Sequence, residues 1–285
     1  MADKNTNKQV KKESLSLRFL YHTMVGRLCL KPLVSRTFSK IMGRYMDSRL
    51  SKPMIKRFVK KNNINLDDFY SDNFKCFNDC FTRKIKEDKR PIDMNEEAFI
   101  SPCDSLLSAY RVKENTKLII KDSIYSVSDL FENEELAKKY TGGICLVFRL
   151  CVTHYHRYIY LDNCTKEANH FIKGKLHTVR PIALEALPVF KRNCREYTVM
   201  HTENFGDVTQ MEVGAMLVGK IKNHHNDGEH LRGEEKGMFL YGGSTIVVFL
   251  EKDKVDLDPK YFEATEKGEE IDVLMGQKLG SKKDA

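Results

Sequence analysis

Tryptophan is absent from this 285-residue chain, and no stretch approaches 18 consecutive apolar residues. Because a membrane-spanning helix needs about 20 such residues, we expect none here. The N-terminal stretch MADKNTNKQVKKESLS also lacks the apolar segment of a secretory signal, so we expect no export. A disulfide framework needs an oxidising compartment, and we therefore expect the eight scattered cysteines to be free thiols that are buried as small hydrophobes.

Several motifs of known chemistry are missing as well. No Gly-x-Gly-x-x-Gly opens a helix, and the chain has neither a Walker loop nor a His-Glu-x-x-His, which speaks against nucleotide binding. Ser244 is not followed by a glycine two residues later, as the nucleophile elbow of α/β-hydrolases requires. Cys76 and Cys80 could be half a metal site, but no second Cys or His pair stands nearby at ligand spacing, so we predict no metal.

The positive charge is concentrated at one end of the chain. Residues 1–61 carry 16 Lys or Arg and 3 Asp or Glu, whereas the rest of the chain carries 32 basic and 37 acidic residues. We expect residues 1–14 to be a disordered basic leader. Over 15–66, apolar residues recur every three or four positions, which predicts helices. This basic segment can be a helical subdomain with a solvated face, a surface that lies on an anionic membrane, or a nucleic-acid site; no nucleic-acid motif supports the last.

Residues 67–285 are rich in β-branched and aromatic residues, with Gly-, Asn- and Asp-containing loops between the apolar runs. One helix is expected among them, at about residues 127–140. Strands and helices do not alternate, so we expect no doubly wound parallel sheet. The predicted fold is α+β, with N-terminal helices packed on an antiparallel β-sandwich or barrel-like core.

Three polar sites stand in apolar surroundings. Asp104 follows Pro102, His156 lies in an apolar strand, and Ser244 follows two glycines. Each has a structural explanation: a turn or helix cap, a hydrogen-bonded histidine at a strand end, and a hairpin turn between two apolar runs. An acid, an imidazole and a hydroxyl occur together, however, where burial can tune them, and this favours chemistry.

The three sites resemble the motifs of phosphatidylserine decarboxylases. Members of this family carry Ser-Pro-x-Asp, Tyr-His-Arg and Gly-Ser-Thr in this order, and this chain has them at Ser101–Asp104, Tyr155–Arg157 and Gly243–Thr245. The likeness extends from about residue 70 to about residue 280, and the segment RLCVTHYHRYIYLDN is most similar to the clostridial branch.

The resemblance implies a self-cleaving enzyme. In this family the Ser244 hydroxyl attacks the carbonyl of Gly243, with His156 as the base and Asp104 as the acid that orients it. Residue 244 then becomes a pyruvoyl cofactor, which forms a Schiff base with the substrate amine and accepts the electrons of the breaking carboxyl bond. The implied reaction converts phosphatidylserine to phosphatidylethanolamine and CO2.

One departure from the family leaves the identity of the catalytic base open. Many members have a second histidine where Ile159 stands here. His156 is therefore expected to act alone or to share the proton transfers with one of three other histidines, which are His154, His177 and His201.

The resemblance also implies partners and a location. We expect phosphatidylserine as the substrate, an anionic membrane surface under the basic segment, a heterodimer of the two cleaved chains, and no nucleic acid. The protein is expected to be peripheral, on the cytoplasmic face of the cell membrane. The alternative from another class is a non-catalytic membrane-binding β-sandwich module, in which Gly242 and Gly243 form only a hairpin turn.

Overall fold

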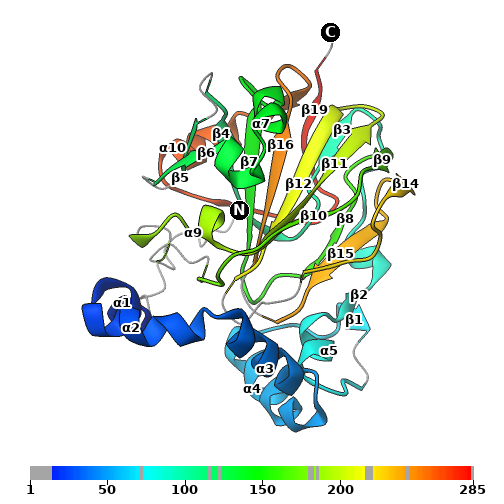
Figure 1. The fold of residues 1–285 in the computed structure, drawn as a ribbon. Coiled ribbons are helices and arrows are strands. Elements are labelled where there is room, and N and C mark those ends of the chain that lie inside the picture. Colours follow the sequence, from blue (N-terminus) through cyan, green and yellow to red (C-terminus); the bar gives the residue numbers. More distant parts are fainter. Residues whose placement is uncertain are drawn as a thin grey trace.

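The computed structural model of the protein describes residues 15–70, 73–113, 117–120, 123–178, 183, 186–215, 221–241 and 244–283. The predicted leader (1–14) and two residues of the predicted cleavage region, Gly242 and Gly243, lie outside the described residues. A large twisted sheet dominates the fold, and the N-terminal helices gather at one end of it (Figure 1).

Four helices make up the N-terminal segment, which are α1 (Leu15–His22), α2 (Met24–Leu33), α3 (Arg36–Met46) and α4 (Pro53–Asn62). Local chemistry sets their ends. The hydroxyls of Thr23 and Ser35 cap α2 and α3, because each accepts a hydrogen bond from the backbone amide three residues later. Pro53 begins α4, and Asn63, the second residue of an Asn pair, ends it in the left-handed conformation. None of the helices described is both long and apolar enough to cross a membrane.

These helices bury one face against the rest of the molecule. Tyr21, Leu30 and Val34 belong to the main hydrophobic core. Met46 and Ile55 belong to a second, smaller core that also contains α5 (Phe77–Phe81). The predicted packing of the N-terminal helices on the β-rich part is therefore confirmed.

Nine antiparallel strands form the main sheet, in the order β14-β9-β11-β12-β16-β7-β4-β18, with β10 beside β11. Their bounds are β4 (Ser105–Arg111), β7 (Ile144–Leu150), β9 (Cys164–Lys166), β10 (His170–Ile172), β11 (Arg195–Thr202), β12 (Gly206–Val213), β14 (Gly228–His230), β16 (Ser244–Leu250) and β18 (Ile271–Val273). All seven residues of the central β16 are buried, as its continuous apolar run predicts. Among the described strands the path runs from β14 to β18 without closing, so the main sheet is open and the barrel-like option does not hold.

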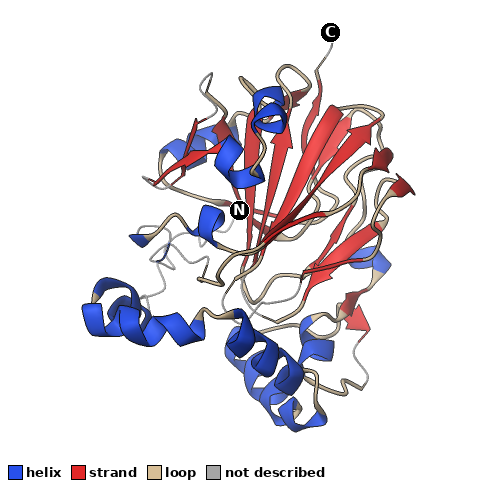
Figure 2. Ribbon diagram, viewed as in Figure 1, coloured by secondary structure: helices blue, strands red, loops and turns tan. Residues whose placement is uncertain are grey.

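Smaller sheets accompany the main one (Figure 2). One consists of β13 (Ile221–Asn223), β15 (Glu235–Phe239) and β8 (Arg157–Ile159), and another of β17 (Val255–Leu257), β19 (Lys278–Lys282) and β3 (Ala98–Ile100). Two strand pairs are β1 (Phe69–Tyr70) with β2 (Lys84–Ile85), and β5 (Lys117–Ile120) with β6 (Ser123–Ser126). Helices interspersed with these strands complete an α+β fold, as predicted.

The prediction of one helix at about 127–140 is wrong, because two short helices stand there. They are α6 (Val127–Phe131) and α7 (Glu134–Lys139). Glu132 adopts a left-handed conformation with φ of 53°, which ends α6, and the Asn133 side chain caps α7 by accepting the Leu136 amide. The other described helices in this part of the chain are α9 (Val189–Arg192), α10 (Lys260–Glu266) and a short 3-10 helix at Glu87–Lys89.

The hairpin interpretation of the two apolar runs around Gly242 and Gly243 is also wrong. The first run ends in β15, which pairs with β13 and β8, whereas the second is β16, which pairs with β12 and β7. The two strands belong to different sheets. The chain therefore passes from one sheet to the other between Phe239 and Ser244. The predicted cleavage position is the bond between Gly243 and Ser244, where β16 begins.

Candidate active site

Ser244 is the first residue of β16, in the middle of the main sheet. Its side chain is fully buried, and its hydroxyl has no hydrogen-bond partner among the described residues. Leaving a buried hydroxyl unpaired costs about 1–3 kcal/mol. The hydroxyls of Ser105 and Thr245 are also buried without a partner among the described residues, so the state of Ser244 is compatible with a reacting hydroxyl but is shared by its neighbours.

The register of the sheet places Asp104 at the same end of the strands as Ser244. Leu106 in β4 and Thr245 in β16 pair with Arg149 in β7 from opposite sides. Both strands are antiparallel to β7 and so run in the same direction. The residues that precede Leu106 and Thr245 therefore lie at one edge, two strand spacings or about 10 Å apart.

The Asp104 carboxylate is buried and paired with Arg90. The Nε and Nη2 of Arg90 donate to Oδ1 and Oδ2 at 2.8 and 2.6 Å, and the Met275 amide donates to Oδ1 at 2.9 Å. Such bidentate, charge-assisted contacts are among the strongest hydrogen bonds in proteins. The hydrogen bond to Asp104 raises the pKa of Arg90, so the guanidinium stays charged. No sequence motif marks Arg90, which ends the charged run KIKEDKR.

His156 is fully buried just before β8. Its Nδ1 lies 2.9 Å from the carbonyl oxygen of His154. Because a carbonyl oxygen can only accept, Nδ1 carries the proton, and in the neutral ring Nε2 carries the lone pair. The imidazole is thus held in the tautomer of a base that acts through Nε2.

The surroundings of His156 tie it to the segment that leads into β16. Its carbonyl oxygen accepts the amide of Phe239 in β15. Its ring packs against Phe81, with 4.1 Å between centroids. Phe81 in turn contacts Tyr241, three residues before Ser244, at 5.3 Å. Phe81 and Tyr241 are therefore part of the site, although no sequence motif marks them.

The two neighbours of His156 in the Tyr-His-Arg motif fix the backbone around it. Arg157 Nη1 donates to the Glu235 carboxylate at 2.8 and 3.1 Å, and its Nε donates to the Thr82 carbonyl oxygen at 2.8 Å. The Tyr155 hydroxyl accepts the Ile85 amide at 3.4 Å. The motif thus combines one imidazole with two anchors.

The structure brings the three predicted residues to one region but does not join acid and imidazole directly. Among the described residues, the hydrogen bonds of the Asp104 carboxylate go to Arg90 and to the Met275 amide, and none goes to the His156 ring. Asp104, His156 and Ser244 are all buried. Their catalytic roles stay predictions, and no hydrogen bond between the described side chains of Asp104 and His156 supports the orienting contact that the relay assumed.

His154 lies close to this site. Its Nδ1 accepts the Cys151 amide at 3.0 Å, so that lone pair is already engaged. Burial lowers the pKa of His154, and the charges of Asp272 and Asp104 offset part of this effect. The ring is therefore a neutral neighbour of the site rather than a second base at Nδ1.

The two remaining candidate histidines are placed differently. His177 is buried, and its Nδ1 faces the Tyr21 hydroxyl of α1 at 3.4 Å. His201 pairs with Asp207, beyond the row that contains Leu250 at the far end of β16. That end is about 20 Å along the strand from Ser244, so His201 is outside hydrogen-bond reach of Ser244.

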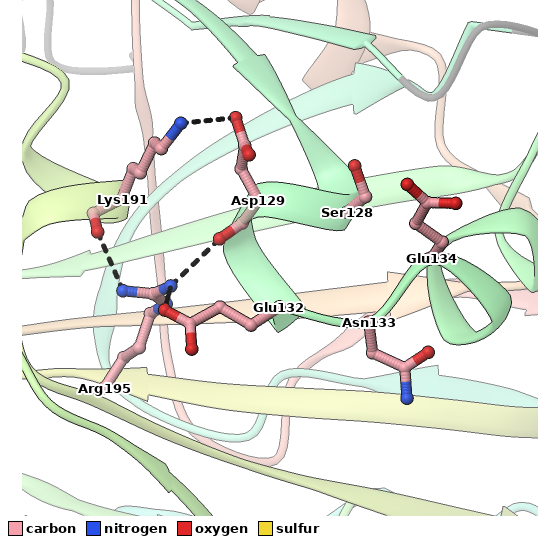
Figure 3. A pocket seen from close by; sticks show the side chains of 7 residues that line it. All are labelled: Ser128, Asp129, Glu132, Asn133, Glu134, Lys191 and Arg195. Atoms are coloured by element: carbon pink, nitrogen blue, oxygen red, sulfur yellow. Dashed lines mark hydrogen bonds and ion pairs between the residues drawn. The ribbon is translucent and has the colours of Figure 1, made fainter.

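A pocket lined mostly by charged side chains lies where α6, α7 and α9 meet β11 (Figure 3). Arg195, which lines it, is in one row with Val213 and Thr245. Because successive residues of a strand point to opposite faces, Arg195 lies on the face that Ser244 does not use. Its guanidinium donates to four backbone carbonyl oxygens, those of Leu130, Lys191, Asn193 and Asp129. This cluster holds α6 and α9 on β11.

Comparison with known proteins agrees with the motifs. The family model described as phosphatidylserine decarboxylase matches residues 77–281. The phosphatidylserine decarboxylase proenzyme 2 of Clostridium acetobutylicum is 41% identical over 94% of this chain and 92% of its own length. The phosphatidylserine decarboxylase proenzyme of Clostridium novyi is 43% identical over 93% of this chain and 92% of its own. The predicted likeness to the clostridial branch is thus confirmed, and this chain belongs to the phosphatidylserine decarboxylase family.

Proposed function

We propose that this protein is a proenzyme that cleaves itself between Gly243 and Ser244 and then converts phosphatidylserine to phosphatidylethanolamine and CO2. One observation carries the proposal. The Ser244 hydroxyl is buried without a partner among the described residues, at the end of β16 that lies level with the start of β4, next to Asp104. Membership in the family supplies the class of reaction and the substrate.

Self-cleavage needs a base and an open carbonyl. His156 Nε2 takes the proton of the Ser244 hydroxyl, whose oxygen adds to the carbonyl carbon of Gly243. The peptide nitrogen leaves, and elimination then opens the resulting ester. Gly243 suits this position because it has no side chain to shield its carbonyl. The Asp104 carboxylate, paired with Arg90, contributes its charge near Ser244. In this proposal it does not hydrogen-bond to the His156 ring.

Water then hydrolyses the new N-terminal residue 244 with release of ammonia and leaves a pyruvoyl group, whose ketone would supply an electron sink for the electron pair of the breaking carboxyl bond. The residues around this position fit such a group, because position 244 is fully buried and an imidazole with a fixed tautomer lies beside the preceding segment. After CO2 leaves, we assign His156 Nε2 as the atom that returns a proton to the substrate carbon.

The two cleaved chains are proposed to stay together as a heterodimer. Residues 244–283 contribute the central β16 and the edge strand β18 to the main sheet, and also β17 and β19 to the sheet that contains β3. β16 is buried along its whole length between β12 and β7. The smaller chain therefore cannot leave without unfolding the larger one.

We also propose that residues 15–66 lie on an anionic membrane at the cytoplasmic face. Exposed apolar side chains stand four residues apart on three helices, as the pairs Leu15 and Phe19, Met24 and Leu28, and Ile41 and Tyr45. Every Lys and Arg between residues 15 and 61 is exposed as well. Apolar stripes flanked by basic residues suit the interface of an anionic bilayer.

The position of these helices supports the same proposal. Tyr241 packs against the smaller core that α3, α4 and α5 share, and its amide donates to Asn78 Oδ1 at 3.0 Å. Only two residues separate Tyr241 from Ser244. A lipid held at the surface of these helices is thus on the side of the molecule where β16 begins (Figure 1).

The activity test uses vesicles that contain phosphatidylserine. The wild-type protein should release CO2 and form phosphatidylethanolamine, and Ser244→Ala should do neither. Thr245→Val is the matched control, because Thr245 is also buried with an unpartnered hydroxyl among the described residues but points to the other face. A fully active Ser244→Ala protein refutes the proposal, and equal inactivity of both variants would mark a packing defect instead.

A further inference from the structure

We propose that His225, His230 and Glu234 bind one divalent transition-metal ion, for which zinc is the best match. His225 lies between β13 and β14, His230 ends β14, and Glu234 directly precedes β15. One donor atom from each residue lies within 4.8 Å of the other two. The cluster stands at the end of β8 that is remote from His156, so it is separate from the candidate active site.

The spacing of the donors is close to what zinc needs. His225 Nε2 lies 3.6 Å from Glu234 Oε1, and His230 Nδ1 lies 3.2 Å from both oxygens of that carboxylate. Bonds of about 2.0–2.2 Å in a tetrahedral zinc site separate neighbouring donors by about 3.3 Å. Small side-chain rotations would therefore complete the coordination.

Neighbouring groups hold the three side chains in place. The His230 ring stacks on Tyr160, with 4.3 Å between centroids and 3° between planes. The Tyr160 hydroxyl lies 3.4 Å from His225 Nδ1, the nitrogen that faces away from the carboxylate. Metal-bound histidines use an outer partner of this kind to fix the tautomer and the ring orientation. The Leu231 amide donates to Glu234 Oε2 at 3.1 Å.

The charges also favour a cation. Two imidazoles, 4.4 Å apart between centroids, face a single carboxylate. Metals bind the neutral imidazole. Two neutral rings and one carboxylate carry a net negative charge that a bound cation would balance. A simple ion pair would need only one of the two histidines.

The donor set selects the class of ion. Two imidazole nitrogens and one carboxylate oxygen suit zinc and its neighbours in the first transition series, whereas magnesium and calcium prefer oxygen alone. The His230 side chain is 7% exposed, but those of His225 and Glu234 are each 37% exposed. The fourth position thus faces solvent and is expected to hold water. The ion would clamp the segment between β13 and β15.

The test uses the full-length protein, stripped with a chelator and titrated with Co²⁺ as a spectroscopic probe and with Zn²⁺ in thermal melts. We expect one ion per chain, a tetrahedral cobalt spectrum without a thiolate charge-transfer band, and a melting temperature that rises with Zn²⁺. His225→Ala and Glu234→Gln should each weaken Co²⁺ binding at least tenfold. His224→Ala is the matched control, because His224 pairs with Glu235 at 2.6 Å and is outside the cluster.

Two results would overturn the proposal. No saturable binding at micromolar metal would leave the cluster as a hydrogen-bonded ion pair only. Undiminished binding in both His225→Ala and Glu234→Gln, or a thiolate band that survives them, would move the ion to the free cysteines. Circular dichroism of the metal-free variants checks that each one is folded, and the outcome is independent of the decarboxylase activity.

Discussion

Replacing Met24 and Leu28 by serine should release the protein from anionic vesicles. The two side chains are 90% and 65% exposed and stand one helical turn apart on α2. Burying an exposed side chain of this size contributes about 1.5–3 kcal/mol, so the exposed fractions together give about 3 kcal/mol for the pair. Since about 1.4 kcal/mol corresponds to a factor of ten, the partition coefficient should fall about a hundredfold.

Sedimentation with vesicles of phosphatidylserine and phosphatidylcholine measures this coefficient. The control is Met94→Ser with Leu231→Ser, because these side chains are 64% and 69% exposed but lie outside the N-terminal helices. The control should bind like the wild type. Binding of the wild type should weaken as salt rises, since exposed charges are screened over about 8 Å at physiological ionic strength.

Two outcomes would refute this reasoning. An equal loss in both double variants would mean that any exposed apolar pair contributes, and that the N-terminal helices have no special role. A loss below about threefold for Met24→Ser with Leu28→Ser would mean that this face of α2 does not enter the bilayer, because the worked value is about a hundredfold. Turnover of a soluble short-chain substrate should be the same in all variants.

Three further predictions concern stability and processing. Lys236→Met should lower the free energy of unfolding by about 3–5 kcal/mol, because it leaves the charge of the fully buried Glu212 unpaired. Adding Glu212→Gln to this variant should recover most of the lost stability. Urea unfolding of the uncleavable chain measures both effects, and a loss below about 1 kcal/mol in the single variant contradicts the prediction. Burial lowers the pKa of His177 from 6.5 to about 4. Between these two pH values the unfolded chain takes up a proton that the folded chain does not, so the protein loses stability as the pH falls. The loss should be about 2 kcal/mol at pH 5. His177→Gln should remove this part of the pH dependence, and unchanged slopes in pH-dependent melts argue against it. Arg90→Met should slow self-cleavage, seen by denaturing electrophoresis, while the exposed neighbour Lys89→Met should not; wild-type rates in both would deny Arg90 a role.

Local signals were sufficient for much of the fold. The end of α4 at the Asn pair, the capping of α2 and α3, and the burial of β16 all follow from short-range patterns. The strand pairing of the two apolar runs around Gly242 and Gly243 does not follow from such patterns. Two apolar runs have the same pattern whether they pair with each other or with distant strands, because strand pairing depends on contacts far apart in sequence.

The candidate site was predictable only where a motif marks it. Asp104, His156 and Ser244 stand in recognisable motifs, and the register then brings two of them to one edge of the sheet. Arg90 was not predictable, because an arginine in a charged run carries no pattern of its own. His225 and His230 looked like polar loop residues, since their cluster exists only where the chain folds back to place Glu234 and Tyr160 beside them.

Intact-mass analysis of the purified wild-type protein tests the central claim most directly. Self-processing predicts two chains, residues 1–243 and the 42 residues 244–285, which remain associated until they are denatured. The smaller chain should have no free amino terminus and should be lighter by one ammonia than the corresponding serine-ended peptide, as a pyruvoyl group requires. Ser244→Ala should yield one full-length chain. A single full-length species that decarboxylates phosphatidylserine would contradict the account.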